Sequence, residues 1–420
     1  MRRTSSVLFR LVAVLVLLGA MMMTGPLHKP PPQPIRIGVL HSLTGTMAVS
    51  EAPLVDAIRL AVEEINADGG LLGRPVDMVV VDGRSDWNVF AREAERLIER
   101  ERVSVLFACW TSACRKAVKP VVERHDHLMF YSVQYEGLEQ SPNIVYTNSA
   151  PNQQIVPGTH WALERFGKRV YLIGSDYVFP RIANVMIRDL VNADEGQILA
   201  ERYLPLGGYG DVAAVVDEIE RLRPDVVLNT LNGDSNAAFF AQLLEAGLAD
   251  LPILSFSLTE SEMGILQGDR FNRHFSVRSY FQSIDSPENR RFVERFKSRF
   301  GAERTIGDAT ESSYVAVKLW AKSVLAAQSY QPKRVNQSVV RQSIDGPSAI
   351  ASVDPMTRHV WNMVRIGRVL PGGQFEQVYA TERPLRPSPW PFYRSREAWL
   401  DLVGQFERDA SGVSEKDEKE

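Results

Sequence analysis

Apolar residues in the first hundred positions alternate between short strand-like runs and longer stripes with helical spacing. The run IRIGVL at 35–40 predicts a buried strand, and apolar side chains three to four residues apart over 54–66 predict a helix after it. Further strands are predicted at 75–82 and 103–109, with a helix at 90–100 between them. Strands that alternate with helices in this way indicate a parallel sheet with helices on both faces.

The same alternation begins again in the second part of the chain. Strands are predicted at 169–174, 199–204, 225–231, 252–257 and 275–280, and helices at 181–190, 237–246, 289–300 and 310–329. We therefore expect two similar α/β lobes instead of one large sheet, joined by crossings near 147–154 and 280–286.

The predicted domain order follows from this division. The first lobe covers 35–150, with part of 287–345 returning to it, and the second covers 151–286. The proline-rich run ERPLRPSPWPFYRS indicates an extended strap, so 346–408 is interpreted as a shared strand and strap region. The charged residues at 409–420 predict a disordered tail.

The N-terminus carries the pattern of an export signal. Arg2, Arg3 and Arg10 precede an apolar run at 11–25, and a proline-rich spacer follows. The run is short for a membrane span, which needs about 20 apolar residues. No clean A-x-A cleavage site or lipid-accepting cysteine follows, so 1–34 is interpreted as a cleaved signal peptide or an uncleaved signal-anchor. A cytoplasmic protein is the third alternative.

Composition narrows the class of protein. Apolar residues make up 45% and charged residues 24% of the 420, as in an ordinary soluble globular protein. A net charge of −3, without basic runs interleaved with aromatic residues, argues against nucleic acid as a partner. Cys109 and Cys114 are expected to be reduced or inert core thiols; a bridge between them is the alternative, although it would sit awkwardly across a helix start. Without clustered histidine partners they predict no metal site.

The sequence lacks the motifs of common catalytic and cofactor sites. It contains no G-x-S-x-G, H-E-x-x-H or G-x-x-x-x-G-K-[ST] pattern, and no G-x-G-x-x-G after the first strand. His125 and His127 lie just before a predicted strand, where a surface turn is the expected role. Ser112 has no histidine placed by sequence to activate it as a nucleophile. We expect no catalytic residue, no cofactor and no enzymatic activity.

Polar and aromatic side chains gather at the predicted strand ends. They include Trp110, Thr111, Ser112, Tyr131 and Ser132 in the first lobe, and Tyr177 and Asp234 in the second. The carboxyl ends of parallel strands meet at one edge of a sheet, where open α/β sheets bind ligands. With hardly a cation among them, these side chains suit neither phosphate nor an isolated carboxylate. They suit a small neutral polar molecule, whose N–H groups need acceptors and whose carbonyl needs donors.

Six segments of the chain are distinctive: IRIGVLHSLTGTMAVSE, EEINADGGLLGRPV, FACWTSACRKAVKPVVE, FYSVQYEGLEQSPNIVYTNSAPNQQ, IGSDYVFPR and NTLNGDSN. They closely resemble the urea- and short-chain-amide-binding proteins of ABC transporters, and the resemblance covers about 35–380. It implies a two-lobe type I periplasmic-binding-protein fold of the branched-chain-amino-acid-binding superfamily, which closes over its ligand by hinge motion. It also implies a periplasmic location, in agreement with the export pattern of the N-terminus. If that segment is the uncleaved signal-anchor, it would tether the protein to the inner membrane.

The resemblance also implies which residues line the ligand pocket in the interlobe cleft. They are Trp110, Thr111, Ser112, Tyr131, Ser132, Val133, Tyr177, Asp234 and Tyr280. Ser112 would donate to the ligand carbonyl, and Asp234 would accept from the ligand's N–H groups. Trp110, Tyr131 and Tyr177 would wall a planar ligand. Trp110 agrees with the urea-binding relatives, which favours urea.

The leading interpretation is a receptor that captures urea or a short-chain aliphatic amide and delivers it to an ABC permease. The run RPLRPSPWPFY also resembles the end of the cytoplasmic amide sensor that regulates amidase expression through a partner protein. The apolar N-terminal segment argues against that alternative. An amidase is the third alternative, and it would need Ser112 as its nucleophile.

Overall fold

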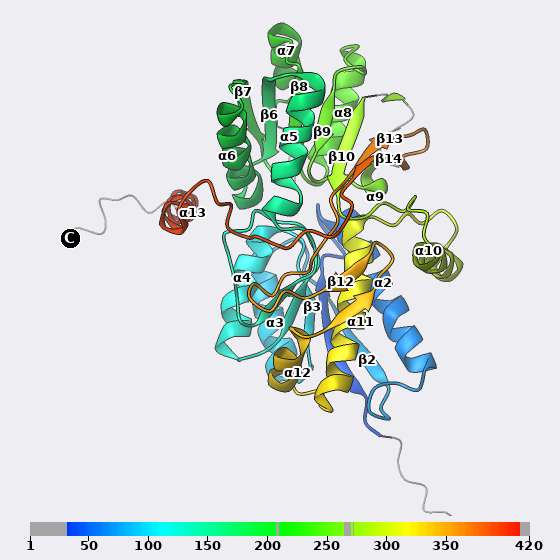
Figure 1. The fold of residues 1–420 in the computed structure, drawn as a ribbon. Coiled ribbons are helices and arrows are strands. Elements are labelled where there is room, and N and C mark those ends of the chain that lie inside the picture. The colour runs from blue at the N-terminus through cyan, green and yellow to red at the C-terminus, as the bar shows by residue number, and fades with distance from the viewer. Residues whose placement is uncertain (1–31, 207–209, 264–269, 272, 412–420) are drawn as a thin grey trace, which may run out of the picture. The chain divides into compact units, whose positions relative to one another are not determined.

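Two mainly parallel β-sheets, each flanked by helices, form two lobes (Figure 1). The computed structural model describes residues 32–206, 210–263, 270–271 and 273–411, and nearly all of them belong to one compact unit, Pro34–Glu420. The predicted export segment lies almost wholly outside the described residues. Among the described residues, no helix is long and apolar enough to cross a membrane. The predicted α/β fold with two parallel-sheet lobes is confirmed.

The first lobe contains five described strands, all parallel, in the order β2-β1-β3-β4-β5. They are β1 (Ile35–His41), β2 (Val76–Asp82), β3 (Leu106–Ala108), β4 (Met129–Tyr131) and β5 (Ile144–Tyr146). The helices after the first three strands are α2 (Ala48–Ala67), α3 (Trp87–Glu99) and α4 (Ser112–Arg124). The buried residues of α3, Phe90, Ala94 and Leu97, recur at helical spacing and share a core with Leu40 of β1.

A segment late in the chain also belongs to the first lobe. The helices α10 (Pro287–Phe300), α11 (Asp308–Ala327) and α12 (Pro332–Val339) follow the second crossing, and α11 packs against α2 (Figure 1). Leu319 and Trp320 of α11 are fully buried in the same core as Ile37 and Val39 of β1. The hydrophobic core of the first lobe is therefore completed by residues almost three hundred positions away from its first strand.

The second lobe has seven described strands in the order β14-β13-β10-β9-β8-β6-β7. The parallel ones are β6 (Arg169–Ser175), β7 (Gln197–Leu204), β8 (Val226–Thr230), β9 (Ile253–Ser255) and β10 (His274–Arg278). The antiparallel edge is β13 (Arg365–Val369) and β14 (Phe375–Ala380). A separate ladder of β11 (Ser343–Asp345) and β12 (Ile350–Ser352) packs against the first lobe beside α11. The helices are α5 (Ile155–Phe166), α6 (Val178–Ala193), α7 (Val212–Leu222), α8 (Ser235–Glu245) and α9 (Glu260–Met263).

The C-terminal strap crosses both lobes and ends in a helix, α13 (Arg396–Ser411). The carbonyl of Pro389 accepts a hydrogen bond from the backbone N–H of Leu138 at 2.8 Å. Gly137 allows this crossing, because its φ is 71° and a Cβ there would lie 2.3 Å from the Pro389 oxygen. Trp399 of α13 is fully buried and donates its indole N–H to the Pro391 carbonyl at 2.9 Å. The helix overlaps the start of the tail predicted at 409–420, and residues 412–420 lie outside the described part of the chain.

Candidate functional site

A covalent ring encloses the loop that follows β3. Cys109 and Cys114 form a disulfide, so the prediction of two reduced thiols is wrong. Cys109 has a left-handed backbone, with φ 72°, and Cys114 lies in the first turn of α4. This arrangement brings their Cα atoms to 5.6 Å, within the range of about 4.4–6.8 Å that a disulfide spans. The ring therefore constrains Trp110, Thr111 and Ser112.

Hydrogen bonds fix the same loop from two sides. Thr111 caps α4, and its side-chain oxygen accepts from the backbone N–H of Cys114 at 3.1 Å. Tyr131, at the end of β4, donates its hydroxyl to the carbonyl oxygen of Trp110 at 2.5 Å. Trp110, Thr111, Ser112 and Tyr131 are all buried. Residues from two separate strand ends thus meet at one edge of the first sheet, as the sequence predicted.

Arg115 is fully buried beside this loop and is bound by two carboxylates. Its Nη2 donates to Glu136 Oε1 at 3.0 Å, and its Nε donates to Glu139 Oε1 at 2.9 Å. Ser112 Oγ accepts from Arg115 Nη1 at 3.0 Å and donates to Glu136 Oε2 at 2.5 Å. Burial disfavours the charged guanidinium, but Glu139 and Glu136 outweigh it and hold the pKa of Arg115 well above its usual range. Two carboxylates against one guanidinium leave this cluster with a formal negative charge.

Sequence reasoning missed all three charged members of this cluster. Arg115 follows Ser112 by three residues on α4, so both lie on one face of the helix, which is a signal that could have found it. Glu136 and Glu139 lie in a segment without helix or strand, where no periodic pattern marks a buried side chain.

Tyr177 lies immediately before α6 in the second lobe and interacts electrostatically with this cluster. Burial raises the pKa of its hydroxyl, and the first-lobe groups Tyr131 and Glu136 raise it further. Tyr177 is 9% exposed, and its ring centroid lies 6.4 Å from that of Phe179. Trp110 and Tyr131 belong to one apolar cluster and Tyr177 to another, and α4, whose Ala113 packs against the second cluster, contacts α6 across the lobes.

Asp234 occupies a different part of the interlobe boundary. It is exposed, precedes α8, and accepts a hydrogen bond from Thr46 Oγ1 of the first lobe at 3.3 Å. Nearby, Ser50 of α2 donates to Glu262 Oε1 at 2.8 Å, also across the lobes. These four residues line a small cavity of about 50 Å³. Two interlobe hydrogen bonds thus hold the start of α2 against the second lobe.

The remaining predicted site residues are buried, with different neighbours. The Tyr280 hydroxyl donates to Asn289 Oδ1 at 2.7 Å, and its ring belongs to an apolar cluster with Phe292. Ser132 and Val133 are 4% and 2% exposed, in the loop directly after β4. Within the described part of the chain, no hydrogen bond joins Tyr280 to the loop after β3.

Two buried arginines lie at or beside the strand ends, where the sequence predicted hardly any positive charge. Besides Arg115, Arg278 at the end of β10 is 1% exposed and forms an ion pair with Asp308 at 3.6 Å. Both were missed, and the expectation of an edge with hardly a cation is wrong for this reason.

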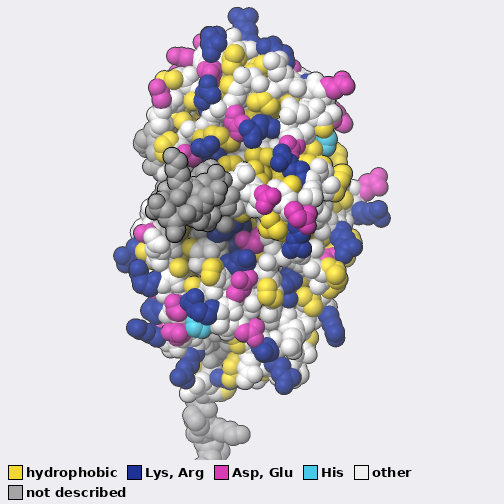
Figure 2. All heavy atoms as spheres, turned by 90° about the vertical axis from the view of Figure 1, so that its left-hand side faces the viewer, with side chains coloured by type: hydrophobic (Ala, Val, Ile, Leu, Met, Phe, Trp, Pro, Cys, Tyr) yellow, Lys and Arg dark blue, Asp and Glu magenta, His cyan; other side chains and the backbone are white. Residues whose placement is uncertain are grey.

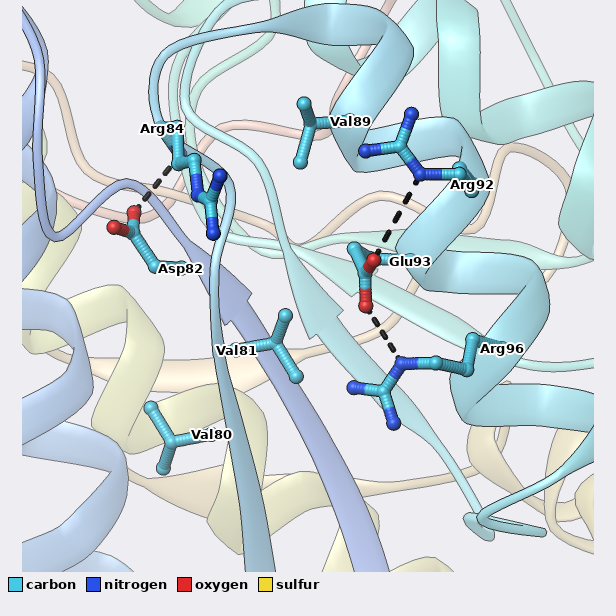
Figure 3. A pocket seen from close by; sticks show the side chains of 8 residues that line it. All are labelled: Val80, Val81, Asp82, Arg84, Val89, Arg92, Glu93 and Arg96. Carbon is cyan, nitrogen blue, oxygen red and sulfur yellow. Dashed lines mark hydrogen bonds and ion pairs between the residues drawn. The ribbon is translucent and has the colours of Figure 1, made fainter.

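A groove on the outer surface of the first lobe is occupied by its own ion pairs. It has a volume of about 310 Å³ and lies between β2 and α3. Figure 3 shows Glu93 between Arg92 and Arg96, with Glu93–Arg96 at 2.7 Å, and Asp82 accepting from the backbone N–H of Arg84. Glu93 is paired with Arg92 and Arg96, and Asp82 already accepts a hydrogen bond. Basic and acidic side chains are also interspersed over the molecular face in Figure 2. We assign no ligand to this groove.

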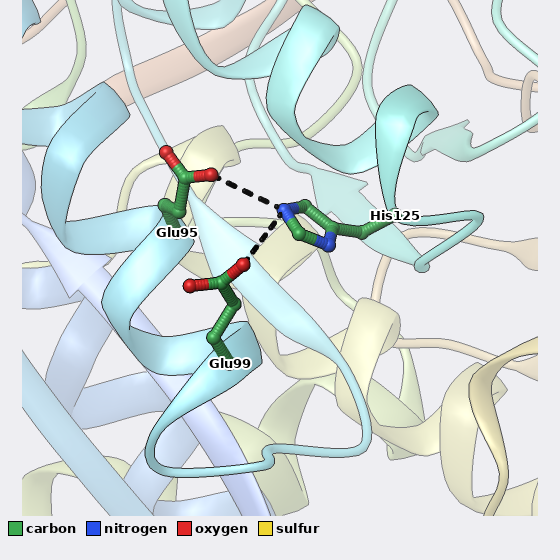
Figure 4. Close-up of side chains that lie close together, drawn as sticks. All are labelled: Glu95, Glu99 and His125. Atoms are coloured by element: carbon green, nitrogen blue, oxygen red, sulfur yellow. Dashed lines mark hydrogen bonds and ion pairs between the residues drawn. The ribbon is translucent and has the colours of Figure 1, made fainter.

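Three side chains on the first lobe could together contact a metal ion. His125 Nε2 lies 3.4 Å from Glu95 Oε1 and 3.8 Å from Glu99 Oε1 (Figure 4). Arg124 donates to the same Glu95 oxygen at 2.9 Å, so a cation would compete with a guanidinium for it. The arrangement is explained as an ion-pair cluster between α3 and the end of α4, and we assign no metal to it.

Comparison with known proteins places the chain in a family. A family model described as "Periplasmic binding protein domain" matches residues 35–396. The chain belongs to this family. As a periplasmic binding protein with the type I fold, it is a substrate-binding receptor of the ABC-transporter kind and not an enzyme, and the family implies a periplasmic location.

A relative with a binding-protein name matches most of the chain at moderate sequence identity. The chain is 24% identical over 336 residues to Leu/Ile/Val-binding protein homolog 8 from Brucella abortus, which covers 75% of this chain and 82% of that protein. A stretch of 116 residues is 30% identical to a limonene hydroxylase from Geobacillus stearothermophilus, covering 28% of this chain and 21% of that protein. The chain spans only about a fifth of that relative's length, so no activity is inferred from it.

Solved structures share the fold. A solute-binding protein from R. palustris in complex with 4-hydroxybenzoate superposes with a TM-score of 0.75, at 21% identity, covering 86% of this chain and 100% of that one. A branched-chain amino acid transporter substrate-binding protein from Streptococcus pneumoniae in complex with isoleucine has a TM-score of 0.74 at 16% identity, covering 84% of this chain and 100% of that one. At these identities the likeness concerns the fold alone.

Proposed function

We propose that this periplasmic binding protein captures urea or a short-chain aliphatic amide between its lobes and delivers it to an ABC permease. The observation that carries the proposal is the set of buried aromatic side chains beside the contact between α4 and α6, with Trp110 and Tyr131 from the first lobe and Tyr177 from the second. Flat aromatic side chains from both lobes suit a small planar ligand. The sequence segments that resemble those of urea- and amide-binding proteins support the same ligand class.

The charge of the adjacent cluster supports a neutral ligand at this position. Arg115 is already matched by Glu136 and Glu139, so an added anion would meet a formal negative charge in a buried environment. The N–H groups of an amide would instead find carboxylate acceptors. Ser112, which now donates to Glu136, is the hydroxyl that can turn to the ligand carbonyl.

The other predicted site residues have subordinate roles in the proposed complex. Asp234, at the interlobe boundary with Thr46, accepts from ligand N–H groups as the lobes close. The wall of the pocket is completed by Thr111, Ser132 and Val133, with Tyr280 on the hinge side. Because ligand contacts come from both lobes, binding favours the closed state.

Carboxylates are a second candidate class of ligand. The two structural neighbours described above hold 4-hydroxybenzoate and isoleucine, and both ligands carry a carboxylate. The observation in this chain that favours the class is Arg278, a buried guanidinium near the crossing between the lobes.

Isothermal titration calorimetry with urea, acetamide, leucine and 4-hydroxybenzoate tests the proposed function. We expect saturable heat with urea or acetamide and a Ser112→Ala variant that binds about tenfold to hundredfold more weakly, since a buried polar contact is lost. Ser298→Ala, an exposed serine on α10, is the matched control and should bind like the parent protein. No heat with urea or any short amide would remove the proposal.

We propose further that the N-terminal segment directs export, either as a cleaved signal or as an anchor. Sequencing the N-terminus of the mature protein separates these two outcomes. Recovery from the cytosolic fraction with an intact Met1 would contradict both and would favour an amide sensor acting through a partner protein.

A further inference from the structure

Arg278 ends β10 as a fully buried guanidinium that is only partly satisfied. Its Nε donates to the Leu258 carbonyl at 2.9 Å. Its Nη1 and Nη2 have no hydrogen-bond partner among the described residues, and the nearest carboxylate oxygen, Asp308 Oδ1, lies at 3.6 Å. The two terminal nitrogens of an arginine carry four of its five N–H groups, so most of its donor capacity is unused here.

Further unpaired polar atoms lie around the same crossing. Gln134, in the loop after β4, and Gln154, at the first crossing, both donate an Nε2 hydrogen to the Phe256 carbonyl, at 3.3 and 3.0 Å. Their Oε1 atoms have no partner in the described part of the chain, nor has the hydroxyl of Ser257. All of these side chains are at most 3% exposed. Donors and acceptors from both lobes are therefore buried together without being satisfied by one another.

Buried polar atoms without hydrogen-bond partners cost free energy unless another polar group, such as one on a ligand, bonds to them. A buried donor or acceptor without a partner destabilises a fold, and an incompletely bonded charge does so most. Asp308 forms an ion pair with Arg278 but no hydrogen bond, because 3.6 Å is beyond hydrogen-bond distance, and Asp308 Oδ1 has no hydrogen-bond partner among the described residues. A planar guanidinium with both terminal nitrogens available matches the two oxygens of a carboxylate.

This cluster is connected to the proposed amide pocket through the chain. Gln134 follows Val133 in the loop after β4, and its amide contacts Phe256. Two residues beyond Phe256, the Leu258 carbonyl accepts from Arg278. The loop that follows Tyr131 thus contacts, through Gln134, the segment whose Leu258 carbonyl binds Arg278.

We propose that Arg278 binds a carboxylate of the ligand in the interlobe cleft. The substrate class rests on the proposed function: it is a short amide or urea derivative that also carries a carboxylate. The amide or ureido group then lies near Ser112, where Arg115 is already hydrogen-bonded by two carboxylates. The carboxylate lies at Arg278, which interacts with the charges of Asp308 and Glu260 but whose Nη1 and Nη2 have no hydrogen-bond partner among the described residues. Gln134, Gln154 and Ser257 contribute the surrounding polar contacts.

Matched pairs of probes test the assignment by calorimetry. Methylurea and N-carbamoylglycine share a ureido group and differ in a carboxylate, as do propionamide and succinamic acid for the amide group. We expect the acid of each pair to bind at least about tenfold more tightly than its neutral partner. Arg278→Met should remove that preference, with a loss of about tenfold to hundredfold for the acids and little change for the neutral probes.

Three further variants separate ligand binding from structural damage. Arg278→Lys keeps the charge and should bind the acids with intermediate affinity, because it lacks the paired N–H groups. Asp308→Asn should bind the acids more tightly than the parent, because the carboxylate that competes for Arg278 is gone. Arg394→Met, which breaks a two-bond contact with Asp189 elsewhere on the second lobe, is the control and should leave all affinities unchanged.

The outcomes distinguish this inference from the proposed function. Equal affinities within each pair and no effect of the Arg278 variants would overturn the carboxylate site while the amide function stands. Binding of acetate or 4-hydroxybenzoate that depends on Arg278, without binding of any amide or urea, would support the carboxylate site and overturn the amide function. No heat with any probe would overturn both. An Asp308→Asn protein that folds but binds the acids no better than the parent would also count against the inference.

Discussion

Removing the disulfide between Cys109 and Cys114 tests how far the site loop depends on its covalent ring. The perturbation is the double variant Cys109→Ala with Cys114→Ala, with reduction of the parent protein as a parallel route. The chain contains two cysteines, so a reductant has one disulfide to act on. Both residues are at most 2% exposed, and alanine avoids placing a new hydroxyl in the core.

The expected magnitude follows from the size of the ring. The two cysteines are five positions apart, so the loop is short and its closure entropy is worth about 2 kcal/mol at 25 °C. We expect the free energy of unfolding to fall by about that amount. The loop carries Trp110, Thr111 and Ser112. In the variant without the ring this loop must be ordered when the ligand binds, so the ligand affinity should also fall, by about threefold to tenfold.

Two assays measure the two effects. Unfolding is followed in guanidinium chloride, because urea is itself a proposed ligand, and affinity is followed by calorimetry with acetamide. Reduced parent protein and the double variant should agree with each other. If oxidised, reduced and variant proteins have the same unfolding free energy and the same affinity, the ring does not constrain the loop and this reasoning is refuted.

Two further predictions concern the buried charges of the first lobe. Arg115→Met should lower the free energy of unfolding by about 3–5 kcal/mol, measured in guanidinium chloride, because Glu136 and Glu139 would stay buried without their counter-charge; a loss below about 1 kcal/mol would contradict the role of the network. Burial lowers the pKa of His359 to about 4, with Nδ1 bonded to the Thr357 carbonyl and Nε2 to the Tyr135 hydroxyl. In the unfolded chain His359 has its ordinary pKa of 6.5, so the unfolded state takes up a proton at a higher pH than the folded state does. The free energy of unfolding therefore falls as the pH drops from about 6.5 to about 4, by up to about 1.4 kcal/mol per pH unit. His359→Gln should remove that slope relative to the parent, and an unchanged slope would contradict the assignment.

The long, regular elements could be predicted because their patterns are strong. The β-branched runs of β1 and β2 were predicted as strands and the apolar stripe of α2 as a helix, and the structure has these elements. The helix α2 begins earlier than predicted, at Ala48, and contains Pro53. The elements that were missed have weak or contrary local signals. The α5 sequence includes Pro157 and Gly158 near its start, and β5 is only three residues long. Packing in the core, which sequence propensity does not report, decides such segments.

The candidate site was predictable where it follows from topology. Trp110 and Tyr131 end neighbouring parallel strands, and the structure brings them together. The disulfide depends on the left-handed backbone of Cys109, which no residue type in the sequence announces. Arg278 lies within an apolar strand run, FSVRSY, and its burial becomes visible only when the crossing between the lobes is in place.

The measurement that tests the central claim most directly is small-angle X-ray scattering of the protein titrated with urea and with acetamide. Ligand contacts from both lobes predict a saturable decrease in the radius of gyration with at least one of the two, as binding favours the closed lobes. A Tyr177→Ala variant, which removes the second-lobe aromatic ring from the junction, should need more ligand for the same change. A scattering curve that stays the same at every concentration of both ligands would contradict the account.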